Sequence, residues 1–312
     1  MVAKKGVRKS RTFPTKAQAM AWAVDIEREI ERGIYSGVQN RPFSDLLREY
    51  VRKVSPKKKC FRWEQLRINI LCDDPLGGVM LPELQAAHFA DYRDRRLQTV
   101  SAATVLREWN LLSHVMNTAV NEWNWLAHNP LKSVKRPKEP PPRERRISQD
   151  EIDRLLFALG YEYDKPAETV SARVGAALLF AIETAMRAGE ICGLRWDDVD
   201  FENRTAKLPQ TKNGFARMVP LSIEAVRLIE QVKSDADTVF NLKTSQIDAL
   251  FRKAKSRALI EDLHFHDSRA EAITRLSAKV DILTLARISG HRDLKMLQVY
   301  YRESMADVAK RI

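Results

Sequence analysis

Residues 263–269 read LHFHDSR, residues 289–291 read SGH and residues 300–301 read YY, and these stretches decide how the rest of the chain is interpreted. With Arg187 and Lys212 upstream, they supply guanidinium, ammonium and imidazole groups together with a phenol. No acidic cluster, Cys/His ligand set or glycine-rich phosphate loop accompanies them in the sequence. Such cations neutralise the nonbridging oxygens of a phosphodiester, and a tyrosine can attack its phosphorus to form a covalent intermediate. The sequence therefore indicates chemistry on a phosphodiester.

The chain is strongly basic. A net charge of +12 and a pI near 9.6 favour a polyanionic partner, either nucleic acid or an anionic membrane surface. The longest apolar run, residues 174–182, is far shorter than the ~20 residues needed to span a bilayer. A signal peptide requires an apolar stretch after its basic start, and none follows the basic N-terminus here. Nucleic acid is thus the expected partner and no membrane contact is expected, with a merely basic soluble protein as the simpler alternative.

The three cysteines, Cys60, Cys72 and Cys192, are scattered and lack the CxxC spacing of a zinc site. An odd number of isolated thiols is typical of a reducing compartment and argues against a disulfide framework. We therefore expect incidental thiols, and neither a metal nor a cofactor.

The first 40 residues form a basic segment. Residues 1–12 carry five lysines and arginines and no acid. The run RKSRTF at 8–13 alternates as a short strand does, and residues 17–30 have the apolar spacing of a helix. Gly33, Gly37 and Pro42 predict a boundary near residue 40. Residues 1–40 can be interpreted as an arm that binds nucleic acid or, more simply, as a solvated tail.

Residues 41–137 are predicted to form an all-helical domain, because apolar residues recur there at helical spacing. In one short helix the predicted core stripe comprises Phe61, Trp63, Leu66, Ile70 and Leu71. Basic residues that precede this helix are candidates for contact with DNA, namely Lys57, Lys58 and Lys59. A solvated charged edge is the simpler interpretation of these lysines.

A basic, proline-rich linker is predicted at residues 138–146. Residues 132–146 hold seven lysines and arginines around Pro137 and the run PPP at 140–142. Consecutive prolines favour an extended, semi-rigid spacer. Such a connector can lie along a duplex, which makes Arg136 and Lys138 further candidates for DNA contact, although an ordinary exposed linker also fits the composition.

Residues 147–312 are predicted to form a mostly helical domain with a small sheet. The sequence SQDE at 148–151 is a capping-type start for a helix through Leu159, and residues 174–184 are apolar nearly all round, as a central helix is. Residues 199–203, 205–208 and 217–221 are predicted strands, with turns at 203–204 and 213–214. The expected fold class is mainly α with a small β-sheet or hairpin region (α+β): a helical DNA-binding domain linked to a mixed, mostly helical catalytic domain.

Five motifs occur in the order found in one enzyme family. They read TAMRAGEICGLRW (184–196), TKNGFARMVPL (211–221), HDSR (266–269), SGH (289–291) and QVYYR (298–302). On these motifs the chain resembles the tyrosine recombinases of the phage-integrase family over about residues 41–312, most specifically over 184–301. Ser268 and Ser289 stand where the family usually has leucine or another apolar residue. The run SRTFPTKAQA from residue 10 resembles the end of the family's arm-binding module, which residues 1–40 are too short to hold in full.

The resemblance implies a role for each motif residue. Arg187, Arg269 and His291 would hold the scissile phosphate, and Glu190 would orient Arg187. Lys212 would protonate the leaving 5′ oxygen, while His266 would hydrogen-bond to the attacking phenol or exchange a proton with it. Tyr300 is the expected nucleophile, with the adjacent Tyr301 as its rival. His264 lies outside the motif and is expected to be non-catalytic.

The resemblance also implies the reaction and the partners. The enzyme would join DNA to tyrosine through a 3′-phosphotyrosyl link and then exchange strands between attachment sites on double-stranded DNA, independently of metal and ATP. It would act as a tetramer on DNA in the bacterial cytoplasm, at the nucleoid, with residues 303–312 docking on a neighbouring protomer. A host DNA-bending protein and an excisionase are further candidate partners. The alternatives are a type IB topoisomerase, which performs the same chemistry without exchange, and a catalytically inactive DNA-binding regulator.

Overall fold

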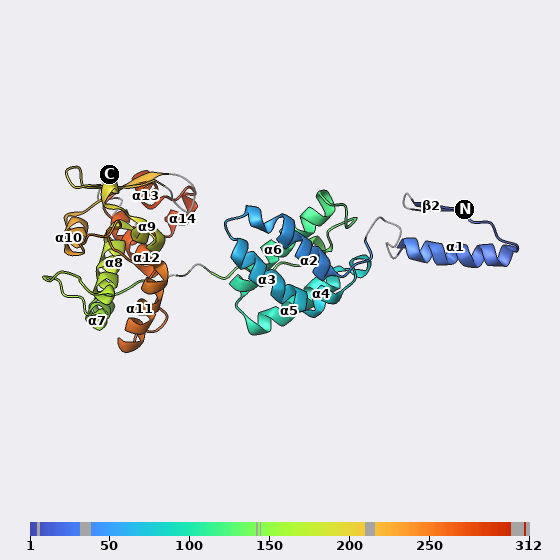
Figure 1. Cartoon of the computed structure of the whole chain (residues 1–312), viewed down its shortest axis with the longest axis horizontal. Helices are drawn as coiled ribbons and strands as arrows, with labels where there is room; N and C mark the ends of the chain where they lie inside the picture. The colour runs from blue at the N-terminus through green and yellow to red at the C-terminus, as the bar shows by residue number, and fades with distance from the viewer. Residues whose placement is uncertain are drawn as a thin grey trace. The chain divides into compact units, whose positions relative to one another are not determined.

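The computed structural model describes residues 1–4, 7–31, 39–141, 143, 145–209, 216–300 and 309. The chain divides into two compact units, Met1–Pro142 and Arg143–Ile312, and helices dominate both (Figure 1). Small antiparallel sheets accompany the helices, which confirms the expected α+β class. Lys212, the turn at 213–214, Tyr301 and nearly all of the tail 303–312 lie outside the described residues.

A short hairpin and one helix form the N-terminal part of the first unit. Strands β1 (Val2–Lys4) and β2 (Val7–Lys9) pair antiparallel, with Val2 opposite Lys9. Helix α1 (Lys16–Glu31) follows, and its Ile26 is buried together with Val2. The sequence predicted the helix, whereas the strand that it predicted at 8–13 lies further toward the N-terminus.

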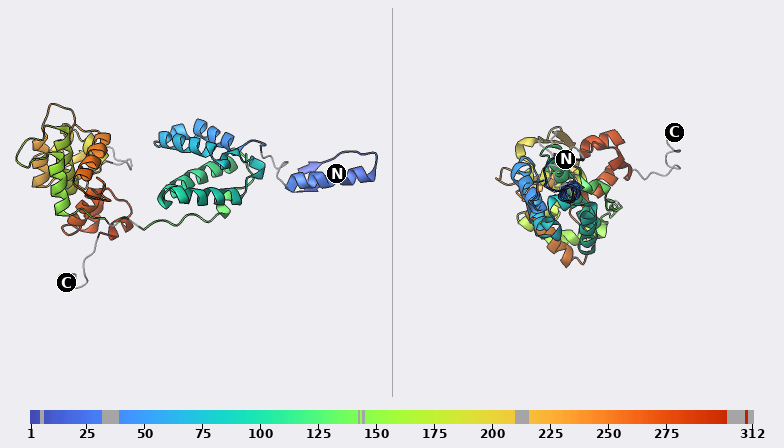
Figure 2. Two further views of the ribbon diagram at one scale, coloured as in Figure 1. Left: turned by 90° about the horizontal axis from the view of Figure 1, so that it is seen from below. Right: turned by 90° about the vertical axis from the view of Figure 1, so that its right-hand side faces the viewer.

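A helical bundle makes up the rest of the first unit, and its helices pack side by side (Figure 2). The elements are α2 (Phe43–Lys53), η1 (Ser55–Lys57), α3 (Phe61–Asp73), α4 (Pro75–Gly78), η2 (Leu81–Glu83), α5 (Ala86–Thr99), α6 (Ala102–Asn121) and η3 (Pro130–Ser133). Phe43 packs edge-to-face on Phe89 in the core, with ring centroids 5.9 Å apart. The apolar faces of α2, α5 and α6 thus meet as their helical spacing predicts.

The predicted core stripe of α3 is wrong in most of its members. Trp63, Leu66 and Ile70 are 37%, 59% and 48% exposed, whereas Glu64, Ile68 and Leu71 face the core. The cause is a polar cluster: Glu64 accepts hydrogen bonds from Ser55 Oγ (2.7 Å) and Lys58 Nζ (2.9 Å). A carboxylate with such partners can be buried, so the helix turns its opposite face to solvent.

The second unit is built around α8 (Val170–Thr184), which lies amid the other helices in Figure 1. Phe180 of α8 packs on Phe240 at 4.9 Å between ring centroids. Helix α7 (Gln149–Leu159) begins with the predicted Ser148–Glu151 capping box. Gly160 caps its C-terminus with φ 67°, a left-handed conformation that glycine adopts without steric cost. The remaining helices are α9 (Ala188–Gly193), η4 (Trp196–Asp198), α10 (Ile223–Gln231), α11 (Thr244–Arg257), α12 (Asp267–Ser277), α13 (Ile282–Ser289) and α14 (Lys295–Gln298).

A three-stranded antiparallel sheet lies between α9 and α10 in the sequence. Its order is β3 (Val199–Asp200), β4 (Thr205–Leu208) and β5 (Arg217–Pro220). Leu208 pairs with Arg217, so this pair closes the ladder where residues 209–216 connect β4 to β5. Three strands were predicted here, and the expected position of Lys212 is in this connection.

The end of the predicted linker is bound to the second unit. Arg143 donates to both carboxylate oxygens of Asp267 at 3.0 Å, and Arg146 donates to Glu271 at 3.0 and 3.2 Å. Arg145 forms an ion pair with Glu151. These arginines therefore neutralise acids of their own unit.

None of the helices in the described part of the chain has the length and apolar character that a bilayer crossing requires.

Candidate active site

Arg187 is placed by a sharp turn between two helices. Helix α8 ends at Thr184, Ala185 adopts a left-handed conformation (φ 54°), and Arg187 forms the N-cap of α9. Glu190 accepts the backbone N–H of Arg187 at 2.8 Å and its Nη1 at 3.0 Å. Burial opposes the ionisation of Glu190, but hydrogen bonds from Arg217 and from the Arg187 backbone hold its pKa down to about 2. The carboxylate therefore fixes the Arg187 guanidinium.

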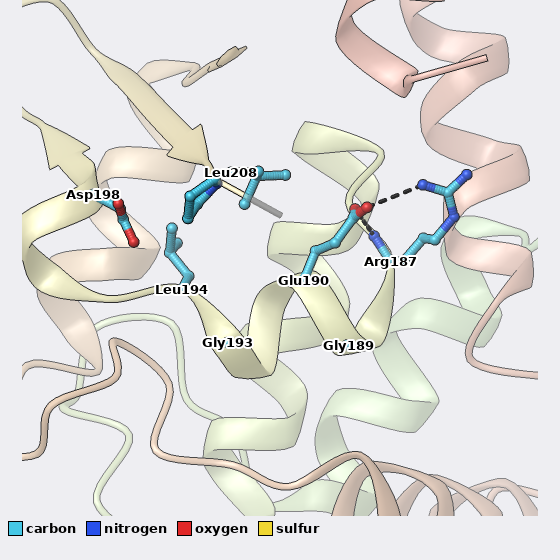
Figure 3. A pocket seen from close by; sticks show the side chains of 8 residues that line it. Arg187, Gly189, Glu190, Gly193, Leu194, Asp198 and Leu208 are labelled. Atoms are coloured by element: carbon cyan, nitrogen blue, oxygen red, sulfur yellow. Dashed lines mark hydrogen bonds and ion pairs between the residues drawn. The ribbon is translucent and has the colours of Figure 1, made fainter. Parts of the chain in front are cut away.

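A cavity of about 440 Å³ opens beside Arg187. Figure 3 shows Arg187 and Glu190 on one side of it and Asp198 on the other. Leu208 and Pro209, at the end of β4, complete its wall. Pro209, the last described residue before Lys212 in the sequence, thus lies in the wall of the cavity that Arg187 lines.

Arg269 lies in the first turns of α12 and is only 4% exposed. Its Nη1 donates to the Ala185 carbonyl and its Nη2 donates to the Ser289 carbonyl at 2.5 Å. Burial, followed by the charge of Arg187, lowers the pKa of Arg269 to about 9. Among the described residues no carboxylate is in direct contact with Arg269, so its position favours an incoming anion.

His291 follows the end of α13. Gly290 ends that helix with φ 72°, and the His291 backbone N–H donates to the Ala286 carbonyl at 3.1 Å. The Ser289 hydroxyl donates to the Leu285 carbonyl at 2.6 Å, and its oxygen lies 2.8 Å from His291 Nδ1. Ser289, which departs from the usual family pattern, thus orients the imidazole ring.

The pKa of His291 is lowered to about 4. Burial is the first cause, and the charges of Arg269, Arg187, Arg217 and His266 add to it. The imidazole is therefore neutral at neutral pH, and the cations that surround it mark the positive potential of the site.

Tyr300 lies among the ends of α12, α13 and α14. Its backbone N–H donates to the Leu297 carbonyl at 3.0 Å, and its own carbonyl accepts from Ser277 Oγ at 3.1 Å. Burial raises the pKa of its phenol, while the charge of Arg269 acts in the opposite direction. Tyr300 is thus held within the field of the buried guanidinium.

The structure brings five of the six predicted catalytic residues into one electrostatic region, namely Arg187, His266, Arg269, His291 and Tyr300. The sixth, Lys212, lies outside the described residues. His264, which was expected to be non-catalytic, is exposed and lies 3.8 Å from Asp267. Sequence reasoning gave no role to Arg217 or to the hydroxyl of Ser289; the only signal was their place inside two of the motifs.

The predicted DNA-contacting residues differ in their surroundings. Lys57, Lys59 and Lys138 are exposed. Arg136 is exposed and donates to Asn110 Oδ1 at 2.7 Å. Lys58 donates to Tyr50 Oη at 2.6 Å and to Glu64 at 2.9 Å, so it belongs to the polar cluster of the bundle.

Across the described part of the chain, no group of three or more His, Cys, Asp and Glu residues could hold a metal ion, and the three cysteines are free thiols.

Comparison with known proteins identifies the family of the chain. Residues 145–307 match the phage integrase family, and residues 39–138 match the phage integrase N-terminal domain. A putative integrase/recombinase of Haemophilus influenzae is 44% identical over 315 residues, which cover 98% of this chain and 85% of that protein.

Two solved structures share the fold. A lambda integrase dimer bound to a COC′ core site has a TM-score of 0.73 at 17% identity and covers 93% of this chain and 89% of its own. A lambda integrase tetramer bound to a Holliday junction has a TM-score of 0.71 at 16% identity, and the match covers 97% of this chain and 93% of that one. The motifs, the fold and the extent of the sequence match lead to one conclusion: the chain belongs to the phage integrase family of tyrosine recombinases.

Proposed function

We propose that this site-specific recombinase cuts and rejoins double-stranded DNA through Tyr300, with the buried cations holding the scissile phosphate. The observation that carries the proposal is the surplus of positive charge around Tyr300. Arg187 and Arg217 bind the carboxylate of Glu190, whereas Arg269 donates to backbone carbonyls, and burial together with the charge of Arg187 lowers the pKa of Arg269 to about 9. An entering phosphodiester relieves this repulsion, and the same charges stabilise the more negative transition state.

The phosphate is bound by Arg187, Arg269 and His291. His291 Nδ1 faces Ser289 Oγ, which leaves Nε2 as the ring nitrogen for a nonbridging oxygen. The bound phosphate raises the pKa of His291, because its negative charge offsets the neighbouring guanidiniums. The imidazole can then bind a proton and donate it as a hydrogen bond to the phosphate.

Cleavage follows by in-line attack. The Tyr300 oxygen forms a bond to phosphorus as the bond between phosphorus and the 5′ oxygen breaks, which gives a 3′-phosphotyrosyl link. The phenolic proton passes to His266, and Lys212 supplies a proton to the leaving 5′ oxygen. A 5′-hydroxyl from a partner duplex reverses the step and completes strand exchange. The covalent bond conserves the energy of the phosphodiester, so the reaction needs no nucleotide cofactor.

The proposed domain organisation follows the same function. Residues 1–40 are a DNA-binding arm, residues 41–137 bind the core site, residues 138–146 link the domains and residues 147–312 carry out catalysis. The similarity to lambda integrase bound to a core site, and to its tetramer on a Holliday junction, supports DNA as the substrate and a tetramer as the active assembly. Lys57, Lys59, Arg136 and Lys138 are proposed backbone contacts, and Lys58 joins them only if its pair with Glu64 opens.

Partners and location also remain proposals. Residues 303–312 would dock on a neighbouring protomer in the tetramer, and a host DNA-bending protein and an excisionase would set the direction of the reaction. The protein would act at the nucleoid in the cytoplasm of a bacterial host. Deletion of residues 303–312 should abolish synapsis of two duplexes; a deletion variant that still forms synapses rules out the docking role.

The test uses a duplex that spans the mapped junction of the DNA element carrying the gene, nicked so that the released 5′ end diffuses away. Wild-type protein should form a covalent adduct that survives denaturing electrophoresis. Tyr300→Phe should form none, whereas Tyr301→Phe should retain it. Adduct loss in Tyr301→Phe alone would reassign the nucleophile. Recombination of two junction sites on one plasmid distinguishes the enzyme from a type IB topoisomerase, and absence of any adduct would indicate an inactive regulator.

A further inference from the structure

Arg217 lies at the base of the hairpin that carries Lys212. It is the first residue of β5 and pairs with Leu208, the last residue of β4. Its side chain is only 9% exposed, although arginine is usually a surface residue. A buried guanidinium must be compensated, and its partners show what it holds in place.

The first partner is Glu190. Arg217 Nη1 donates to Oε1 at 2.8 Å and Nη2 donates to Oε2 at 2.7 Å, which is a bidentate pair. The same two oxygens accept from Arg187 Nη1 and from the Arg187 backbone N–H. Arg217 therefore makes two side-chain hydrogen bonds to Glu190, whereas Arg187 makes one. Without it, Glu190 would pair with Arg187 alone and draw that guanidinium away from the phosphate.

The second partner is the end of α13. Arg217 Nε donates to the Ile288 carbonyl at 2.9 Å. The next residue is Ser289, whose carbonyl accepts from Arg269 and whose hydroxyl contacts His291. Gly290 packs directly on the same guanidinium, because a Cβ there would lie 3.2 Å from Arg217 Nη1 and 3.3 Å from Cδ. The position of the Gly–His motif thus depends on Arg217.

We infer that Arg217 is a positioning residue for strand cleavage, which ties Arg187, His291 and the base of the Lys212 hairpin together without touching the phosphate. The inference rests on the proposed function. Its guanidinium is occupied by Glu190 and Ile288, so the effect on the reaction passes through these neighbours. Lysine keeps the charge but cannot reach both carboxylate oxygens and a backbone carbonyl in one plane.

A matched control exists in the same unit. Arg227 of α10 also binds a carboxylate in bidentate fashion, donating to Glu224 at 2.8 and 2.5 Å, and it donates to the Tyr163 carbonyl at 2.9 Å. Neither partner belongs to the candidate active site. Arg227 also donates to Gln231 Oε1 and Tyr161 Oη at 3.0 Å each. Arg227→Lys therefore removes at least as many bonds as Arg217→Lys, but only Arg217→Lys changes the geometry around Arg187 and His291.

The experiment measures single-turnover adduct formation on the nicked junction duplex, together with the Kd for that duplex and the thermal unfolding of each full-length variant. Arg217→Lys should lower the rate at saturating duplex by about 10²-fold, as expected for misplaced catalytic groups, with the Kd within about threefold of wild type. Arg227→Lys should lower the unfolding temperature to a similar extent and leave the rate unchanged.

Two results would overturn the inference: equal rates for the two lysine variants, or a defect of Arg217→Lys that disappears at saturating duplex. If Arg217→Lys does not fold, Glu190→Gln is used instead, because it weakens the same pair while keeping the side-chain length. It should show the same loss of rate, and an unchanged rate rejects the inference. A wild-type protein that forms no adduct rejects the proposed function itself, which separates the two failures.

Discussion

Each unit contains a glutamate whose carboxylate is buried between two arginines, Glu108 in the first unit and Glu190 in the second, but the two clusters are balanced differently. In the first unit Glu108 is fully buried and accepts hydrogen bonds from Arg96 (2.7 and 3.0 Å) and Tyr92 (2.7 Å), with Arg67 at 3.0 Å. Two guanidiniums there face one carboxylate. In the second unit Arg187 and Arg217 bind Glu190, and a third guanidinium, that of Arg269, donates to backbone carbonyls instead.

The difference separates a structural cluster from a functional one. The Glu108 cluster satisfies its carboxylate within the fold, so its main effect is on stability. The Glu190 cluster has the Arg269 guanidinium as a further positive charge nearby, and burial together with the repulsion from these arginines lowers the pKa of His291 to about 4. Folding alone gains little from such repulsion, whereas a bound phosphate compensates it. Changes in the first cluster should therefore affect folding, and changes in the second should affect cleavage.

The largest effect is expected for Glu108→Ala. Removing the carboxylate leaves the Arg67 and Arg96 guanidiniums half-buried and unpaired, which should cost about 3–5 kcal/mol. Hydrogen exchange of peptides from α6 in the full-length protein measures this locally. Tyr92→Phe is the control and removes one hydrogen bond, for about 1 kcal/mol. A loss in Glu108→Ala no larger than in Tyr92→Phe contradicts the structural role.

Arg269→Gln is the corresponding change in the second unit. Cleavage of the junction duplex should fall by about 10²–10³-fold, as when one donor to a charged transition state is removed. Stability should change less than in Glu108→Ala, because burial already disfavours the Arg269 charge. The exposed Arg154→Gln, which loses a surface pair with Asp150 and a hydrogen bond to the Ala258 carbonyl, serves as the control. A variant that cleaves within about threefold of wild type excludes a role for Arg269 in cleavage.

The pKa of His291 predicts how acid affects the second unit. The folded state keeps the imidazole neutral down to about pH 4, whereas the unfolded chain binds a proton near pH 6.5. This effect is absent above pH 6.5 and destabilises the fold as the pH falls toward 4. Between pH 7 and 5 the loss is at most about 2 kcal/mol, from 1.36 kcal/mol per pH unit below 6.5, and it should be smaller because solvent screens the half-buried ring.

Urea unfolding of free protein at pH 7 and pH 5, followed by hydrogen exchange in α13, tests this dependence. His291→Phe should reduce the difference between the two pH values, since phenylalanine binds no proton. The same pH dependence in both proteins would assign it to another group. Saturating duplex should also reduce the loss in wild type, because the phosphate favours the protonated ring.

The smallest effect is expected at the linker. Arg146 is 55% exposed, and its partner Glu271 keeps a second pair with Arg275 at 2.9 Å. Arg146→Gln should therefore cost less than about 1 kcal/mol, as exposed ion pairs do. Urea unfolding of the second unit measures it, with Lys165→Gln, which breaks an exposed pair with Glu162, as the reference. A loss above about 2 kcal/mol would place Arg146 with the buried clusters instead.

Much of the fold was predictable because it follows local rules. The α7 capping box, the buried helix α8 and the three strands near residue 200 were all read from residue order and confirmed. The buried face of α3 was predicted wrongly. Positions 63, 66 and 70 have the same helical spacing as 64, 68 and 71, so periodicity does not choose between the two faces. Ser55 and Lys58 determine which face is buried, because their hydrogen bonds to Glu64 allow its carboxylate to lie in the core.

The sequence by itself determined the family and the kinds of chemical group in the site, because the motifs keep their order and their residue types whatever the fold does to them. Only the tertiary structure decided which charges are compensated. Arg143 pairs with Asp267 and Arg217 pairs with Glu190, whereas Arg269 donates to backbone carbonyls, which carry no charge to neutralise it. These partners lie 124, 27 and 20 residues or more apart along the chain. A charge is solvated, paired or left in surplus according to which distant groups the fold brings within a few ångströms, and no local pattern contains that information.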